Sequence, residues 1–104
     1  MATRYSLVVP VYRNEEMIPD LLSALAGVDS ALGGGLEVVF AVDGSPDRSL
    51  ARLVELLPHT GLTARLLEMS RNFGAFAAIR AGLTEASGPY FAVMAADLQE
   101  PPEL

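Results

Sequence analysis

The sequence contains no cysteine and no lysine, and it has a single histidine. Without cysteine the chain can form neither disulfide bonds nor zinc–thiolate sites, and it cannot use a thiolate as a nucleophile. Proteins of reducing compartments are commonly free of disulfides, so we expect a cytoplasmic chain. The histidine, His59, follows Pro58 at a predicted helix end, and we interpret it as a surface turn residue.

Basic residues are also few, because seven arginines stand against 13 acidic residues and give a formal net charge of −6. The arginines form no cluster, and binding to nucleic acid needs many Lys and Arg contacts to phosphates. We therefore expect no nucleic-acid partner. Apolar runs are short and none approaches the ~20 residues that cross a membrane. No signal-peptide pattern opens the chain, so we expect a soluble chain.

The size and composition are those of an ordered globular domain. The chain has 104 residues, of which 51% are hydrophobic and 19% charged, and we expect residues 1–104 to form a single domain. The sequence stops soon after Pro101, a residue that suits the first turn of a helix. We therefore expect a domain that is truncated at its carboxyl end.

Short apolar runs alternate with amphipathic segments along the chain. The runs 5–11, 36–42, 63–69 and 90–95 predict four strands, and the segments between them predict three helices. This alternation predicts an α/β fold with a parallel sheet, right-handed crossovers and helices on both faces. The first two runs are the most apolar, whereas the third contains Arg65 and Glu68. We therefore expect the strand order 3-2-1-4, with the third strand at an edge.

The helical segments carry apolar residues at the spacing of one helix face. The side chains that we expect to be buried are Ile18, Leu21, Leu22 and Leu25, then Leu50, Leu53, Val54 and Leu57, and finally Phe76, Ile79 and Leu83. Asn14 is expected to cap the first helix.

The second apolar run ends abruptly in Asp43-Gly44-Ser45-Pro46-Asp47. Gly44 supplies the backbone freedom that a tight turn needs. Ser45 can cap the following helix, Pro46 suits its first position, and Asp47 complements its dipole. Asp43 then lies at the end of a strand, where open α/β sheets bind their ligands. Taken alone, the pattern fits equally well an acid that only hydrogen-bonds nearby backbone.

All four strands of a parallel sheet end at the same edge, which brings residues 10–12, Asp43, residues 70–72 and Asp97 together. An aromatic ring there can stack on a base, one acid can accept from base or ribose, and another can hold a divalent cation. The sequence therefore predicts a nucleotide pocket at this edge. No G-x-G-x-x-G follows the first strand and no Walker A pattern occurs, which disfavours the usual dinucleotide and P-loop folds.

Four motifs at characteristic spacing carry a resemblance to a known family. They are the segments 8–12 (VVPVY), 42–47 (VDGSPD), 70–74 (SRNFG) and 96–103 (ADLQEPPE). Together they resemble the amino-terminal half of inverting, family-two glycosyltransferases of GT-A fold, a Rossmann-like nucleotide-binding half. By motif the most similar members are the dolichyl-phosphate mannosyltransferases and the bacterial polyprenyl-phosphate glycosyltransferases. The resemblance extends from about residue 5 to residue 104.

The resemblance implies roles for individual residues. Pro10 and Tyr12 would border the nucleotide base, and Asp43 would contact it. Asp97 would meet the metal-diphosphate of a nucleotide sugar, with Mg²⁺ or Mn²⁺ as the metal. Arg71 suits a phosphate by geometry, but a structural salt bridge is an equal alternative.

Two departures from the family pattern fall in the same region. The family usually has a pair of acids before Gly-Ser and an Asp-x-Asp at the end of the fourth strand, whereas this chain has Val42 and Ala95 at the first position of each. We interpret the result as a weakened metal site. The first helical turn also contains Glu15, which either is solvated or touches the nucleotide.

The resemblance implies transfer of a sugar from a nucleoside-diphosphate sugar to an acceptor, for which a polyprenyl or dolichyl phosphate is the candidate. The catalytic base of the family lies downstream, so we expect no catalytic residue in this chain and an inactive isolated fragment. The longer parent protein would then act at the cytoplasmic face of a membrane. The fourth strand would be an exposed apolar edge, from which we expect homo-oligomers.

Two other interpretations stay open. A degenerate, non-catalytic nucleotide-binding or regulatory module would keep the fold without metal or catalysis, and Val42 and Ala95 favour it. A receiver-like signalling domain also places acids at strand ends. It is disfavoured because Asp43 is followed by a Gly-Ser-Pro turn and because the chain has no lysine.

Overall fold

The computed structural model describes residues 4–86 and 90–94, and nine short elements follow one another in this part of the chain. They are β1 (Tyr5–Val11), the 3₁₀ helix η1 (Glu15–Met17), α1 (Ile18–Ala31), β2 (Leu36–Asp43), α2 (Ser49–Leu56), the 3₁₀ helix η2 (Leu57–His59), β3 (Thr63–Met69), α3 (Ala75–Glu85) and β4 (Tyr90–Val93). The predicted alternation of strands and helices is confirmed.

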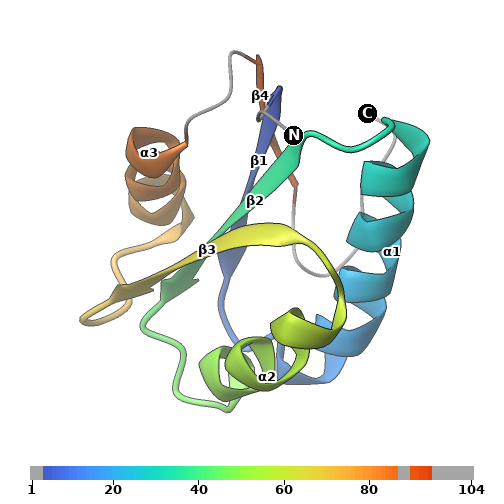
Figure 1. Cartoon of the computed structure of the whole chain (residues 1–104). Coiled ribbons are helices and arrows are strands. Elements are labelled where there is room, and N and C mark those ends of the chain that lie inside the picture. The colour runs from blue at the N-terminus through green and yellow to red at the C-terminus, as the bar shows by residue number, and fades with distance from the viewer. Residues whose placement is uncertain (1–3, 87–89, 95–104) are drawn as a thin grey trace.

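The four strands form one sheet in the order β3-β2-β1-β4, and every pair of neighbours is parallel. This is the predicted order. Figure 1 shows α1 and α2 on one face of the sheet and α3 on the other. β2 is buried along its whole length, whereas β3 alternates between exposed and half-buried residues. The strand that carries Arg65 and Glu68 therefore lies at an edge, as predicted, because charged side chains there can reach water.

The larger part of the core lies between the sheet and the helices α1 and α2. The four α1 residues that were predicted to be buried are buried, and they pack with alternate residues of β1 and β2. The stripe predicted for the second helix is only partly right, because Val54 is 58% exposed. α2 buries Ser49 and Leu53, which are one turn apart, and Val54 lies about 100° further round the helix.

The helix α3 contradicts the predicted pattern more clearly. Phe76 is 88% exposed and Leu83 is also exposed, whereas the residues that face the sheet are Ala78 and Gly82. These two are four residues apart on one face of the helix. A Cβ atom at Gly82 would lie 2.5 Å from Cγ1 of Val8 on β1. Small residues therefore let α3 approach the sheet closely, and hydrophobic periodicity does not detect such a face.

The side chains expected to open the second helix do not cap it. α2 begins at Ser49 and not at Pro46, because the Ser45 hydroxyl donates to Oδ1 of Asp47 and accepts the N–H of Arg13, 2.8 Å away. The Asp47 carboxylate accepts the N–H of Ser49 at 3.0 Å. Asn14 likewise precedes η1 without capping it, and its Oδ1 accepts the N–H of Tyr12 at 2.8 Å.

These hydrogen bonds join the loop after β1 to the loop after β2. Besides the Arg13–Ser45 bond, the N–H of Asn14 donates to Oγ of Ser49 at 3.1 Å, and the N–H of Glu15 donates to Oδ2 of Asp47 at 3.2 Å. In the opposite direction, the N–H of Arg48 donates to Oε1 of Glu15 at 3.2 Å. The two loops therefore form one hydrogen-bonded unit.

The close approach of α3 gives a matched test on two helical glycines. Gly82→Ala should lower the free energy of unfolding by about 1 kcal/mol, since overpacking costs ~1–3 kcal/mol and exceeds the ~1 kcal/mol that Ala gains in a helix. A Cβ atom at Gly27 in α1 would meet no neighbouring element within 4 Å, so Gly27→Ala should raise it by up to ~1 kcal/mol. Urea denaturation measures both. Stabilisation by both substitutions would contradict the close packing of α3.

The hydrogen-bonded loops predict how stability depends on pH. Burial by itself raises the pKa of Asp47, but hydrogen bonds from the Ser45 and Ser49 hydroxyls and from the amides of Ser49 and Glu15 outweigh it and lower the pKa from 3.8 to about 2. Because the folded state has the lower pKa, this stabilisation is complete above the unfolded pKa and is lost as pH falls from 3.8 toward 2.

Asp47→Asn should therefore remove part of the acid-induced loss of stability in that pH window, as followed by urea denaturation at a series of pH values. Glu16→Gln is the control, because it likewise removes one negative charge, from η1, at a residue that makes none of the hydrogen bonds between the two loops. Its curve should keep the wild-type slope. A wild-type slope in Asp47→Asn would show that the loop hydrogen bonds contribute no pH dependence.

Candidate functional site

The carboxyl ends of β1, β2 and β3 lie side by side. The last residue pair of β1 and β2 is Val11 with Val42, and the last pair of β2 and β3 is Asp43 with Met69. The loops that follow these strands therefore leave the sheet at the same edge (Figure 1). We call this the carboxyl edge.

The residues predicted to form the site are distributed over this edge in a simple way. Pro10 and Tyr12 come from the end of β1 and the loop after it, Asp43 is the last residue of β2, and Arg71 follows β3. The structure thus brings these four to neighbouring strand ends. Asp97, predicted to bind the metal-diphosphate, lies outside the described residues.

Tyr12 presents its ring to solvent at the carboxyl edge. Its side chain is 38% exposed, and Cζ of Arg13 lies 5.3 Å from the ring centroid. Arg13 has a φ of 55°, a left-handed backbone that residues other than glycine rarely adopt. The hydrogen bond from its N–H to Ser45 holds this conformation. Tyr12 therefore offers a partly exposed aromatic ring with a positive charge beside it.

Asp43 is the most buried of the predicted site residues, with 2% of its surface exposed. Its Oδ1 accepts the N–H of Phe73 and its Oδ2 accepts the N–H of Gly74, both at 2.9 Å. Its carbonyl oxygen accepts Nδ2 of Asn72 at 3.3 Å. The alternative in which the acid hydrogen-bonds nearby backbone is thus what the structure contains. A contact between Asp43 and a base stays a prediction.

Gly44 lets the turn after β2 pack against the turn after β3. Its φ is 63°, and a Cβ atom at this position would overlap the backbone of Arg71 and Asn72. Residues that carry a side chain rarely adopt such a φ. The atoms that the Cβ would overlap are backbone atoms, which cannot move aside as a flexible side chain could. The glycine predicted for a tight turn is therefore also required by a close contact between loops.

Arg71 lies exposed at the carboxyl edge, with Cζ 4.7 Å from the ring centroid of Phe73. The ion pairs found within residues 4–86 and 90–94 both involve Arg65, which contacts Glu37 and Glu85 at 3.6 Å. In this part of the chain the salt bridge considered for Arg71 is therefore not formed. The contact of Phe73 with Arg71 was not predicted, although both residues lie in the motif 70–74.

Two other residues of this region have clear structural roles. Glu15 accepts the N–H of Arg48 and so belongs to the unit that joins the first two loops. Val42, at a position where the family usually has an acid, is buried in the core beneath α1 and α2. Within the described residues, no group of three or more His, Cys, Asp or Glu side chains could hold a metal ion.

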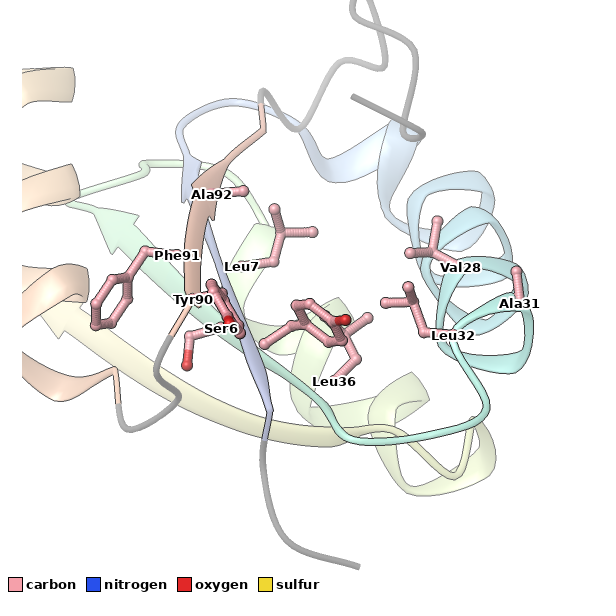
Figure 2. A pocket seen from close by; sticks show the side chains of 10 residues that line it. Ser6, Leu7, Val28, Ala31, Leu32, Leu36, Tyr90, Phe91 and Ala92 are labelled. Carbon is pink, nitrogen blue, oxygen red and sulfur yellow. The ribbon is translucent and has the colours of Figure 1, made fainter.

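The apolar groove of the molecule lies away from the carboxyl edge. It has a volume of about 360 Å³ and is lined near the start of the strands by Tyr5, Leu7, Leu36 and Tyr90 and at the end of α1 by Val28 and Leu32. Figure 2 shows the sheet residues Leu7 and Leu36 on one side of the groove and Val28 and Leu32 on the other. Because the predicted nucleotide residues are at the opposite end of the strands, the groove is not part of that site. Within the described chain no helix has the length and apolar character to cross a membrane.

Curated proteins with similar sequences carry glycosyltransferase names. The undecaprenyl-phosphate 4-deoxy-4-formamido-L-arabinose transferase of Pseudomonas paraeruginosa is 38% identical over 98 residues, which is 94% of this chain and 29% of that protein. The uncharacterized glycosyltransferase YkcC of Bacillus subtilis is 42% identical over 103 residues, which is 97% of this chain and 31% of that protein. The chain thus spans less than a third of the length of these relatives.

Solved structures with a similar fold include two glycosyltransferases of GT-A type. S. aureus TarS, residues 1–349, superposes with a TM-score of 0.75 at 26% identity and covers 91% of this chain and 28% of that one. The mannosyltransferase PcManGT from Pyrobaculum calidifontis, in complex with GDP-Man and Mn²⁺, gives a TM-score of 0.76 at 25% identity, with 93% and 28% covered.

The profile of one protein family matches almost the whole chain. It carries the description "Glycosyl transferase family 2" and covers residues 6–104. The match includes all four motifs, and the fold of the chain superposes on the GT-A neighbours. The chain therefore belongs to glycosyl transferase family 2.

Proposed function

We propose that the chain is the nucleotide-sugar-binding part of a glycosyltransferase that moves a sugar from a nucleoside diphosphate to a polyprenyl or dolichyl phosphate. The family membership supports the reaction class, and the name of the Pseudomonas relative supports the acceptor class. The catalytic base would be supplied by the longer protein. That protein would act at the cytoplasmic face of a membrane, where a lipid-phosphate acceptor and a nucleotide sugar can meet.

The observation that carries the proposal is the placement of Tyr12 and Arg71 at one carboxyl edge, on the loops after β1 and β3 that flank the loop after β2. The exposed ring of Tyr12 is suited to stack on a base, and Pro10 near the end of β1 would border the same base. The guanidinium of Arg71 is suited to a phosphate, and no acid pairs with it in the described residues. Asp43 ends β2, the strand between the two that carry these loops.

A divalent cation is part of the proposal, because a structural neighbour holds Mn²⁺ together with GDP-Man. Asp97 would contact Mg²⁺ or Mn²⁺ through the metal-diphosphate of the nucleotide sugar. Mg²⁺ commonly keeps several waters and relies on substrate phosphates, so one carboxylate can serve when the diphosphate is present. With Ala95 in place of a second acid, the metal should strengthen nucleotide binding only modestly.

A non-catalytic binding module is the second candidate, and the burial of Val42 favours it. Where the family usually has an acid, this chain places an apolar side chain in its core. A module of this kind, nucleotide-binding or regulatory, would keep the fold and the loop geometry without metal or catalysis.

Binding of UDP and GDP to the chain, measured by calorimetry with and without Mn²⁺, tests the proposed function. Tyr12→Ala should weaken binding by ~1–3 kcal/mol, the range for stacking of a base on an aromatic ring. Tyr90→Ala is the control, because Tyr90 is a 62% exposed ring near the opposite end of the strands. Equal binding by wild type and Tyr12→Ala would refute the stacking role. Absence of any nucleotide binding would favour the non-catalytic module.

We also propose that copies of this chain associate through β4. The strand lies at the edge of the sheet, and Tyr90, Phe91 and Val93 are all exposed. An exposed apolar edge strand presents unpaired backbone groups and apolar side chains to a second copy.

Sedimentation velocity at increasing concentration should therefore show dimers or larger species of the wild type. Phe91→Glu should shift the distribution to monomer, because it adds repulsion at the proposed contact. Val54→Glu is the matched control, since Val54 on α2 is similarly exposed but distant from β4. A wild type that stays monomeric at high concentration would rule out the proposed association.

A further inference from the structure

We infer that Asp43 is a positioning residue that acts on the ligand through Arg71. Its carboxylate fixes the turn 70–74, and Phe73 in this turn supports the guanidinium of Arg71 at the carboxyl edge. The inference rests on the proposed function for the identity of the ligand, a nucleoside diphosphate. Its structural part concerns the chain alone.

Hydrogen bonds join Asp43 to the turn 70–74. Both carboxylate oxygens accept backbone N–H groups, from Phe73 and from Gly74, and the carbonyl oxygen accepts the side chain of Asn72. Gly74 immediately precedes α3, so the carboxylate also lies at the positive end of that helix. Hydrogen bonds to a charged acceptor in a buried position are among the stronger ones in proteins. The turn is therefore held from the end of β2.

The turn 70–74 also supports the side chain of Arg71. The residue whose N–H is bound by Asp43 is Phe73, and the ring of Phe73 lies against the guanidinium of Arg71 at 4.7 Å. Gly44 packs directly on the backbone of Arg71, so the turn is confined from a second side. Release of the Phe73 amide would move both the ring and the arginine that rests on it.

The charges of Asp43 and Arg71 are not paired with each other. Backbone amides satisfy the negative charge of Asp43, so the guanidinium of Arg71 stays available to a ligand. A direct contact between Asp43 and a base would instead need a carboxylate that faces the ligand. At 2% exposure, with each oxygen already accepting one hydrogen bond, Asp43 is better placed to organise the edge than to meet the base.

A double-mutant cycle separates the two roles. Asp43→Asn keeps the size of the side chain and removes its charge, and it should weaken UDP or GDP binding by about tenfold, within the usual range for coupled residues. In an Arg71→Ala background the same substitution should have almost no further effect. An equal loss in both backgrounds would overturn the inference and support a direct base contact.

Asp29→Asn is the matched control for this cycle. Asp29 is also a carboxylate that accepts a backbone N–H, from Leu36 at 3.3 Å, but it lies near the opposite end of the sheet. The control should leave nucleotide binding unchanged.

A readout without ligand keeps the inference distinct from the proposed function. In Asp43→Asn the amides of Phe73 and Gly74 should exchange with solvent faster, and the Nε–H signal of Arg71 should show greater mobility by NMR. Wild-type exchange at both amides would overturn the inference even if nucleotide binds. If the wild type binds no nucleotide, the proposed function fails while this measurement still decides whether Asp43 holds the turn and its arginine.

A milder variant covers the case in which Asp43→Asn does not fold. Asn72→Ala removes only the bond to the carbonyl oxygen of Asp43. It should loosen the turn less and weaken nucleotide binding by a few-fold, and this effect should again vanish in the Arg71→Ala background. A loss that persists in that background would count against the inference.

Discussion

The carboxyl edge depends on the hydrogen bonds between the carboxylate of Asp43 and two backbone amides. Asp43 ends the most buried strand of the sheet and binds the amides of Phe73 and Gly74, which open the next turn and the helix α3. A single acid thus connects the end of β2 to a turn and a helix that lie about 30 residues further along the sequence. Because Gly44 packs on the same turn, the connection allows little movement. This rigid group of loops carries the exposed ring of Tyr12 and the exposed guanidinium of Arg71.

The loop after β1 is attached to the loop after β2 by a different set of hydrogen bonds. Ser45, predicted to cap the second helix, accepts the N–H of Arg13, and Asp47, predicted to complement the dipole of that helix, accepts the N–H of Glu15. The carboxyl edge is therefore one connected structure of three loops. Tyr12 and Arg71 lie on its outer loops, and the polar residues between them are used to hold those loops together. This division between supporting and presenting residues is the arrangement on which the proposed nucleotide site rests.

The opposite end of the strands and the outer face of α3 have a different character. Phe76, Tyr90 and Phe91 are exposed, and an apolar groove separates β4 from α1. Isolated exposed apolar residues are common, but an edge strand with several of them favours contact with another surface.

The α/β class, the central place of β1 and β2 and the strand ends that carry the candidate site were predictable from the sequence, because buried parallel strands are continuous apolar runs. The motifs of family 2 were likewise readable in the sequence. The burial of Ala78 and Gly82 in place of Phe76, and the bonds from two amides to Asp43, were seen only in the folded chain. The physical reason is the same in both cases. Periodicity and motifs describe each segment alone, whereas close approach and hydrogen-bond partners depend on segments that meet only after folding.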